Sequence, residues 1–199
     1  MPKIVDHEQR RTQIAEAVWA IVAFRGFEAV TLRSVAAEAG VSMGTVQHYF
    51  TNKEEMIYFA CTQFVEQASS DAESLMEQSN DPNAPRTIIR AIIQQPMPLN
   101  EEQRIGSAVW LAFVSRAAVD DQLGEFIREA WNGLHRVVSA QLRTAQEAGQ
   151  VPATIDTAIE AASLIALVDG FASHLLVGQH TAEMAIKAVD DRLEQLFTD

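Results

Sequence analysis

The chain has 199 residues, of which 48% are hydrophobic, with few glycines and prolines and a single cysteine, Cys61. This composition favours helices around a sizeable core and excludes an internal disulfide framework. The net charge is −12, yet residues 1–53 carry six basic against five acidic side chains, so only the first quarter of the chain is suited to face phosphate.

Apolar residues recur with a helical period along the whole chain, and no alternating pattern typical of a strand exceeds four residues. We therefore predict an all-α fold of about nine helices. The first helix ends at Gly26 and buries Ile14, Val18 and Ile21. Residues 1–11 contain no apolar stretch of the kind found in signal peptides, so we expect a cytoplasmic protein without a secretion signal.

Residues 31–50 have the pattern of two short helices joined at a sharp turn. Thr31 and Ser42 are placed to cap the two helices at their N-termini. Gly40 supplies the left-handed backbone conformation that the turn requires, because a residue without a Cβ adopts it at little cost. Phe50 is expected to face the core. The pattern is that of a helix-turn-helix.

The outer face of the second short helix carries neutral polar and aromatic groups in place of the charges usual on a surface helix. Thr45 and Gln47 are positioned to reach base edges in the major groove, and glutamine pairs with adenine through two hydrogen bonds. His48 and Tyr49 suit phosphate and sugar contacts, although each also fits a partly packed polar residue. The predicted DNA-binding set comprises Thr31, Arg33, Ser42, Met43, Gly44, Thr45, Gln47, His48, Tyr49 and Lys53.

The next helix begins with Asn52-Lys53-Glu54-Glu55, which we interpret as a capping box. The free amides at its N-terminus and the Lys53 ammonium together form an anion site suited to a backbone phosphate. The same helix continues to about Ser79, so it extends well beyond the helix-turn-helix.

Residues 10–60 resemble the DNA-binding domain of the TetR family of bacterial regulators. The resemblance rests on a combined motif of Gly26-Phe27, Thr31, Val35-Ala36, Gly40-Val41-Ser42, Gly44-Thr45, His48-Tyr49-Phe50 and Lys53-Glu54-Glu55. It implies a DNA-binding domain at 1–52 and a ligand-binding and dimerisation domain at 53–199. In such proteins the long shared helix couples ligand binding to the spacing of the two recognition helices.

Aromatic and polar residues interleave in the second domain, where we expect a ligand cavity, although ordinary core packing explains most of them as well. Asp169 is the exception, because an unpaired carboxylate in the apolar segment 164–171 is costly. Arg116, a capping contact or a cationic ligand would satisfy it. The expected lining comprises Phe64, Met97, Trp110, Phe113, Arg116, Trp131, His135, Asp169, Phe171 and His174.

Residues 104–178 resemble the C-terminal domains of TetR-family repressors of the choline and betaine pathway, through Trp110-Leu111-Ala112-Phe113 and the segment 167–171. This resemblance implies a cage of Trp110, Trp131 and Asp169 that holds a quaternary amine by cation–π contact. The residues themselves leave the effector open as a cationic or a hydrophobic small molecule.

The last two helices, roughly 156–178 and 181–197, are expected to form a dimer interface. The first is apolar on more than one face, although Asp169 and His174 interrupt it, so we expect a buried helix and no membrane span. Two such pairs would build a four-helix interface with two-fold symmetry, and a bundle within one chain is the alternative. The predicted interface comprises Ala162, Ala166, Ile186, Val189, Leu193 and Leu196.

These features predict a ligand-responsive transcriptional regulator that binds duplex DNA, most simply a homodimeric repressor released from a palindromic operator by a small molecule. We expect no enzyme, metal or cofactor, because the five histidines lack metalloprotease spacing and the chain has no phosphate-binding glycine loop or nucleophile elbow. The alternative is a helical protein-interaction or small-molecule-binding module without a DNA function, and the motif at 31–55 argues against it.

Overall fold

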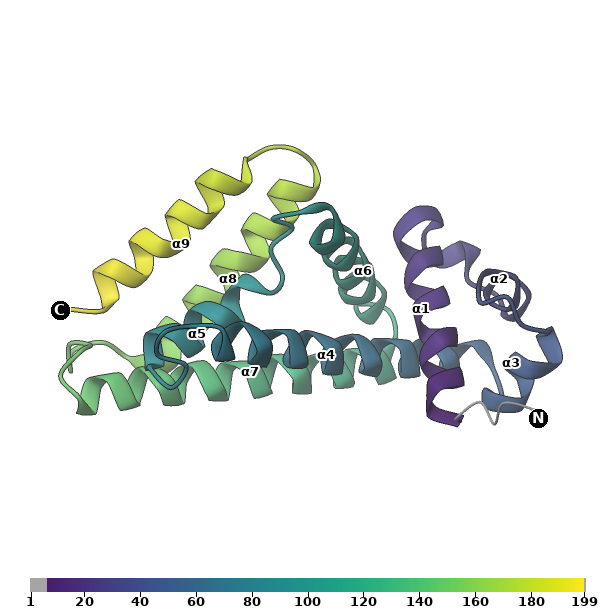
Figure 1. Ribbon diagram of the computed structural model, residues 1–199, viewed down its shortest axis with the longest axis horizontal. Helices are drawn as coiled ribbons and strands as arrows, with labels where there is room; N and C mark the ends of the chain where they lie inside the picture. Colours follow the sequence, from purple (N-terminus) through teal and green to yellow (C-terminus); the bar gives the residue numbers. More distant parts are fainter. Residues whose placement is uncertain (1–6, 199) are drawn as a thin grey trace. The chain divides into compact units, whose positions relative to one another are not determined.

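The structure is a computed structural model that describes residues 7–198, apart from the side chain of residue 102. The first six residues, part of the segment expected to lack a secretion signal, lie outside this range. Within it the chain forms helices and no strand, so the predicted all-α fold is confirmed (Figure 1). The described helices are α1 His7–Arg25, the 3₁₀ turn η1 Phe27–Ala29, α2 Leu32–Glu38, α3 Met43–Tyr49, α4 Lys53–Glu77, α5 Pro85–Gln94, α6 Glu101–Ala117, α7 Asp121–Glu147, α8 Thr157–Leu176 and α9 Ala182–Leu196.

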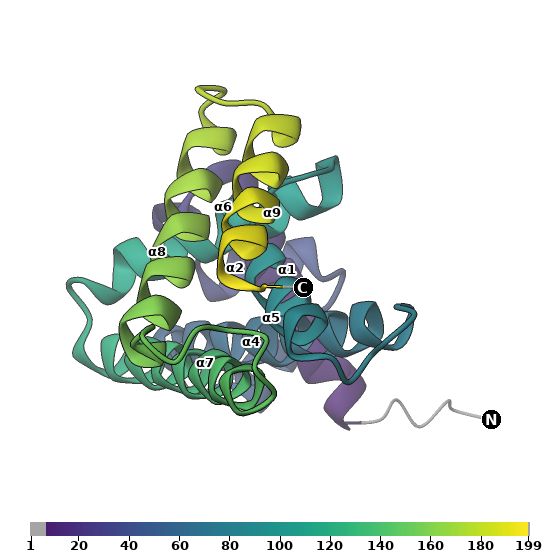
Figure 2. The same ribbon diagram turned by 90° about the vertical axis from the view of Figure 1, so that its left-hand side faces the viewer.

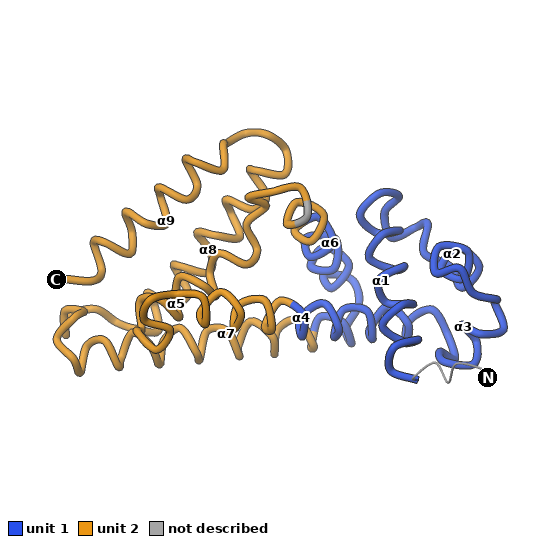
Figure 3. The backbone as a smooth tube through the Cα atoms, viewed as in Figure 1, with its two compact units in different colours: residues 1–67, 108–124 blue, residues 68–107, 125–199 orange. Residues whose placement is uncertain are grey.

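Two compact units share these helices (Figure 3). Unit 1 contains residues 1–67 and 108–124, and unit 2 contains residues 68–107 and 125–199. Helices α4, α6 and α7 therefore each contribute to both units. The predicted division after residue 52 falls at the start of α4, inside unit 1. The first turns of α4 belong there because Met56 and Ala60 are buried and the Trp19 indole N–H donates to the Ala60 carbonyl oxygen at 2.9 Å.

Unit 1 is organised by α1, whose predicted apolar face is confirmed. Ile14, Val18 and Ile21 are completely buried. Helix α1 packs against α2, and α2 packs against α3. Phe50, which follows α3, is also buried, as expected for the residue that closes the bihelical corner. This arrangement fixes α3 on a small apolar core and leaves its other side in solvent.

The core of unit 2 gathers apolar side chains from α5, α7, α8 and α9 and from the segments that connect them. Figure 2 shows α8 and α9 running side by side. The core comprises Ile89, Ile93, Met97, Val138, Leu142, Ala145, Val151, Ala161, Leu164, Val168, Leu175, Ala185, Val189, Leu193, Leu196 and Phe197. A bidentate ion pair also joins two of these helices: Arg90 of α5 donates two hydrogen bonds to the Asp190 carboxylate of α9, each 2.9 Å long.

Three residues predicted for the dimer interface are not available to a partner. Val189 and Leu193 have no exposed surface and Leu196 only 1%, because the apolar seam of α9 closes the core of its own unit. The prediction was wrong for these three, since the same spacing of apolar residues serves a bundle within one chain. Ile186 is half-buried.

Helix α8 has 20 residues and is long and apolar enough to cross a membrane by length and composition. Its most apolar 18 residues have a mean hydropathy of 1.5, and 39% of them are buried. Its buried side belongs to the core of unit 2. Its exposed side, which we name the outer face of α8, carries no aspartate, glutamate, lysine or arginine. The outer face comprises Ala158, Ile159, Ala162, Ser163, Ala166, Gly170 and His174.

Candidate nucleic-acid interface

The first helix of the bihelical corner begins at Thr31, as predicted. The Thr31 hydroxyl accepts a hydrogen bond from the Ser34 backbone N–H at 3.0 Å, and the Ser34 hydroxyl oxygen accepts from the Thr31 backbone N–H at 2.9 Å. The two bonds form a reciprocal capping box that satisfies amides which helical geometry leaves unpaired. Helix α2 therefore starts at a fixed residue, with Arg33 exposed in its first turn.

The turn between α2 and α3 depends on Gly40. Its φ of +64° lies in the left-handed region, which confirms the predicted conformation. The Val41 backbone N–H then donates to the Ala36 carbonyl oxygen at 2.9 Å, which closes the end of α2. The corner is thus set by one residue that lacks a Cβ.

Replacing Gly40 with alanine is expected to lower the free energy of unfolding by about 1 kcal/mol, because an alanine Cβ strains the left-handed backbone. No heavy atom lies within 4 Å of the position that this Cβ would take, so the loss isolates backbone strain. Urea denaturation measures it. Gly40→Asn is the matched control and should lose less, since asparagine tolerates this conformation better. Equal losses in the two variants would contradict the assignment.

Helix α3 exposes most of the face that was predicted to contact DNA. The Ser42 hydroxyl accepts from the Thr45 backbone N–H at 3.0 Å, which confirms the predicted cap. Val46 is buried against the core, while Met43, Gly44, Gln47 and His48 are exposed. The helix therefore shows solvent a short face of neutral polar groups, with its inner side anchored.

Two residues expected to contact base edges differ in availability. The Thr45 hydroxyl lies 2.8 Å from that of Ser42 and is half-buried, so it is already engaged in the cap. Gln47 is exposed, and within residues 7–198 no hydrogen bond engages its side-chain amide. Gln47 is therefore the better placed of the two to form a bidentate pair with a base.

Helix α4 is capped at its N-terminus by Asn52, as predicted, but the hydrogen bonds differ in one respect from the expected capping box. The Asn52 carboxamide oxygen accepts from the Glu55 backbone N–H at 2.8 Å, but Glu55 returns its bond to the Thr51 backbone N–H and not to Asn52. This backbone hydrogen bond lowers the pKa of the Glu55 carboxyl. Lys53, the first residue of α4, is half-buried beside this capped terminus.

Residues of α1 that the sequence reasoning missed belong to the same surface. The His7 ring lies 5.3 Å from that of Tyr49 and 6.0 Å from that of His48, measured between ring centroids. One turn later, the Arg11 guanidinium lies over the Phe59 ring at 4.1 Å. The signal in the sequence was a basic residue four positions after His7, in the part of the chain with a net positive charge.

The residues predicted to line a ligand cavity fall into both units. In unit 1, Phe64 stacks on Trp110 with ring centroids 6.2 Å apart and also packs edge-on against Trp19 of α1 at 5.6 Å. Phe113 lies 5.4 Å from Phe27 of η1. These three predicted ligand residues therefore fasten α4 and α6 to α1 and η1. Arg116 forms its ion pair with Asp120 at 3.5 Å.

In unit 2, Met97 is completely buried in the apolar core. His135 donates to the Ala158 carbonyl oxygen at 2.8 Å, at the first turn of α8. Asp169 lies three turns further on, about 16 Å along the axis at 1.5 Å per residue. His135 and Asp169 are therefore too far apart to line one small cavity. Trp131 of α7 is half-buried.

The far end of α8 holds the last two predicted ligand residues. Phe171 and His174 both face His180 of the α8–α9 loop, with ring centroids 5.8 and 5.0 Å apart. Arg104 donates to the Leu176 carbonyl oxygen at 3.0 Å and so caps this end of the helix. The histidines form an aromatic contact at the helix terminus and do not reach the first turns of α8.

Asp169 is the chemically unusual residue of unit 2. Burial raises the pKa of its carboxyl to about 6, because the charged form loses hydration inside the apolar helix. Its backbone carbonyl accepts from the Ser173 hydroxyl at 3.1 Å, which leaves the carboxyl group unaffected. A cation placed beside this carboxylate would remove the penalty.

An open groove of about 350 Å³ between α5 and α9 was not anticipated. It is lined by Arg86, Thr87, Arg90, Asp190 and Glu194. Its charges are already paired with one another, Arg90 with Asp190 and Arg86 with Glu194. These ion pairs therefore hold α9 against α5, and the residues that line the groove leave no unpaired charge of either sign.

Comparison with known families matches both parts of the chain. Residues 14–58 match the model of bacterial regulatory proteins of the tetR family, and residues 85–198 match that of the BetI-type transcriptional repressor C-terminal domain. The transcriptional regulator PksA of Bacillus subtilis is 32% identical over 178 residues, covering 89% of this chain and 83% of the relative. BetI of Brucella suis is 29% identical over 200 residues, covering 92% and 100%.

Solved structures agree with the fold. A transcriptional regulator from Rhodococcus sp. Rha1 is 28% identical with a TM-score of 0.79, covering 94% of this chain and 95% of that one. A regulator from Saccharomonospora viridis in complex with choline superposes with a TM-score of 0.83 at 21% identity, covering 97% and 100%. All of these similar proteins are named as transcriptional regulators and none as an enzyme.

Proposed function

Because the chain belongs to the TetR family of bacterial transcriptional regulators, with a C-terminal domain of the BetI type, we propose that it is a homodimeric repressor released from a palindromic operator by a small molecule. The chain is a DNA-binding, ligand-responsive regulator. The proposal that the chain binds an operator rests on one observation. The capped helices α2 and α3 meet at Gly40, and the exposed Gln47 side chain on α3 forms no hydrogen bond within residues 7–198. Such regulators work in the cytoplasm, where we place this one.

The charge distribution supports this surface as the DNA-binding one. Residues 54–199 carry nine basic and 22 acidic side chains, so phosphate is repelled from most of the molecule. The α2–α3 corner and Lys53, the first residue of α4, lie in the segment with a slight positive balance. Selection of duplexes from random DNA by the purified protein at low salt tests the proposal directly. Failure to retain any duplex would contradict it.

Gln47→Ala is expected to weaken binding to the selected operator by about 1–3 kcal/mol and to relax specificity at one base pair in each half-site. The loss follows because alanine removes a bidentate donor and acceptor without touching the buried side of α3. Gel retardation across single-base operator variants measures both effects. Gln195→Ala, at an exposed position of α9, is the matched control. An unchanged base preference in Gln47→Ala would exclude the proposed contact.

The outer face of α8 supports the dimer. Ile159 is 66% exposed although it belongs to the most apolar helix of the described chain, and Ala162 and Ala166 are exposed beside it. An uncharged helical face of this length is stabilised by burial. A second copy of the same face is its natural occupant, because two-fold symmetry places small residues against small residues and lets the helices approach. We therefore propose an interface that keeps Ala162 and Ala166 from the predicted set and adds Ile159. Val189, Leu193 and Leu196 are left out of it.

The effector site that we propose includes Asp169. A cationic or partly hydrophobic small molecule would neutralise its carboxylate and bury apolar surface at once. A fold relative was solved with choline, which makes choline a reasonable first probe for this chain. The ligand would shift the population toward a conformation whose two recognition helices no longer match successive major grooves about 34 Å apart.

A further inference from the structure

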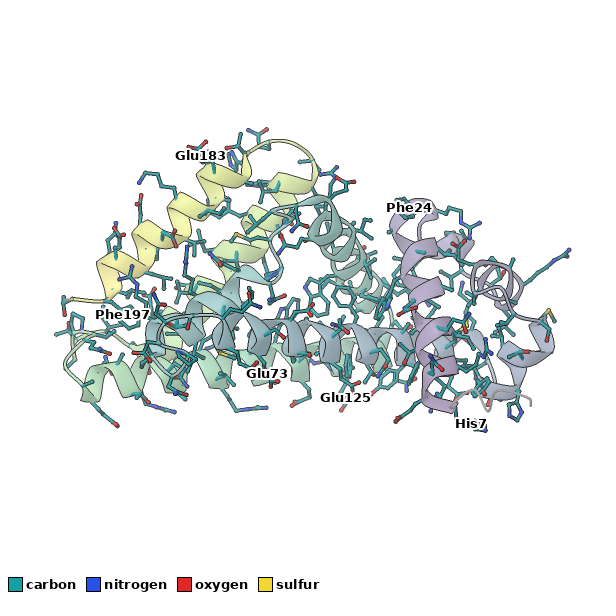
Figure 4. All side chains as sticks on the ribbon, viewed as in Figure 1. His7, Phe24, Glu73, Glu125, Glu183 and Phe197 are labelled. Atoms are coloured by element: carbon teal, nitrogen blue, oxygen red, sulfur yellow. The ribbon has the colours of Figure 1, made fainter. Side chains whose placement is uncertain are left out.

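The first two turns of α1 face the corner between α3 and α4. His7 contacts Tyr49 and His48, and Figure 4 shows His7 at the start of α1. Arg11 follows one turn later on the same side of the helix, with its guanidinium 4.1 Å from the Phe59 ring centroid and 5.3 Å from that of Phe50. We name Tyr49, Phe50 and Phe59 the aromatic corner. The start of α1 is thus fixed to the end of the recognition helix.

The guanidinium of Arg11 is oriented but not neutralised. Its Nε is buried and has no hydrogen-bond partner. Among residues 7–198 no ion pair to Arg11 is observed, whereas Arg25, Arg86, Arg90, Arg116 and Arg192 all pair with carboxylates. Stacking on the Phe59 and Phe50 rings compensates only part of the hydration lost at the buried Nε. Within the part of the chain that the structure describes, Arg11 therefore has a buried Nε without a hydrogen-bond partner and a positive charge without an ion pair.

The acid at the start of α4 does not serve as the anion that pairs with Arg11. The positive charge of Arg11 contributes to lowering the pKa of the Glu55 carboxyl. The Glu55 carboxylate, however, accepts a hydrogen bond from the Thr51 backbone N–H at 2.8 Å and so caps α4. Arg10, the neighbouring base, donates to Gln13 and takes no part in the stack. The position left for an anion lies beside the capped start of α4, where Lys53 and free helix amides also favour negative charge.

The geometry points to Arg11 as a DNA-binding residue that binds a phosphodiester of the operator backbone, with the aromatic corner holding its planar fork in place. This inference rests on the proposed operator function. A rigid guanidinium loses little side-chain entropy on binding and offers two parallel N–H groups to phosphate oxygens. A phosphate held there would also fix α3 in the groove, because His7 and Arg11 join α1 to both ends of the aromatic corner.

The test compares the salt dependence of operator binding in four proteins: wild type, Arg11→Met, Arg11→Lys and Arg10→Met. Arg11→Met keeps an apolar stem over the Phe59 ring and removes the charge. The slope of log K against log salt, which is negative, should therefore decrease in magnitude by about one, and affinity should fall by about tenfold on every duplex. Arg11→Lys should keep the wild-type slope. Arg10→Met, the matched control, should change the slope by less than a third as much.

Lys53→Ala is the positive control and should also reduce the magnitude of the slope by about one. An Arg11→Met protein that melts earlier but keeps the wild-type slope would show a purely structural role and overturn the inference. If Arg11→Met does not fold, Arg11→Gln supplies the neutral variant, because its planar amide still lies over the ring. Failure of the wild type to bind any duplex would instead remove the operator function itself.

Discussion

Ala166→Glu is expected to convert the protein to monomers and to reduce operator affinity by at least about 100-fold, equal to about 2.7 kcal/mol. Ala166 lies in the outer face of α8, which is uncharged in a chain with 27 acidic and 15 basic residues. In a two-fold interface the new carboxylate and its copy enter the same apolar contact. Neither has a cationic partner there, so each loses hydration without compensation.

The effect on DNA follows from the geometry of reading two half-sites. One helix-turn-helix contacts only a few base pairs, and the second contributes to affinity only while the two are joined. Light scattering after size-exclusion chromatography measures the oligomeric state, and fluorescence anisotropy with a labelled operator measures the affinity. Thr144→Glu adds the same charge to an exposed position of α7 and should change neither. A dimeric Ala166→Glu protein would place the interface elsewhere.

The elements that the sequence predicted best are those set by local chemistry. Thr31, Ser42 and Gly40 act through bonds to residues no more than five positions away, so spacing alone was sufficient. Local rules also erred once, at Glu55. There the box was expected to close on Asn52, but the carboxylate reached Thr51, since one side chain can reach either amide at the start of α4.

The errors arose where two tertiary arrangements share one pattern. The seam of Val189, Leu193 and Leu196 has the spacing of an interface helix and of a core helix, and only the packing of α9 on α5 and α8 distinguishes them. Tertiary contacts of aromatic residues were also not foreseen: Phe64 and Phe113, which were assigned to a ligand cavity, contact Trp19 and Phe27. Contacts between residues about 45 or more positions apart leave no periodic signal in the sequence.

Arg11 illustrates a third case, in which the sequence pattern around a residue proposed to bind DNA is the same as that around an ordinary surface arginine. An arginine at the start of an amphipathic helix usually extends into solvent, and the sequence gives no reason to separate Arg11 from Arg10. The structure separates them, because one donates to Gln13 and the other lies over Phe59. Its partner rings come from α4 and from the residue after α3, which only the folded corner brings together.

Asp169→Asn is expected to stabilise the free protein at neutral pH and to abolish its response to a cationic effector. The pKa of the Asp169 carboxyl is raised from 3.8 to about 6 by burial, so the unfolded chain releases its proton more readily than the folded one. The contribution of this group to stability is therefore fully present below pH 3.8 and is lost as pH rises to about 6. Asparagine is neutral throughout and has nearly the same shape.

The free energy of unfolding of Asp169→Asn should exceed that of the wild type by about 2 kcal/mol at pH 7.5, after allowance for the solvent that still reaches the half-buried carboxyl. The difference should shrink to near zero below about pH 4. Urea denaturation at several pH values measures it. Asp81→Asn, in the exposed loop before α5, is the control and should give no such pH-dependent gain. A constant difference across this range would contradict the burial of the charge.

Asp169→Asn also separates the effect of Asp169 on protein stability from its effect on the response to the effector. A cation bound beside the Asp169 carboxylate stabilises the folded wild type in proportion to the logarithm of its concentration, because it stabilises the charged form that predominates at neutral pH. With choline as the probe, the wild type should gain in unfolding midpoint and release operator, while Asp169→Asn should do neither although it is the more stable protein. An effector that releases both proteins equally would be recognised by other groups, and Asp169 would then be a source of strain in α8 and not a ligand.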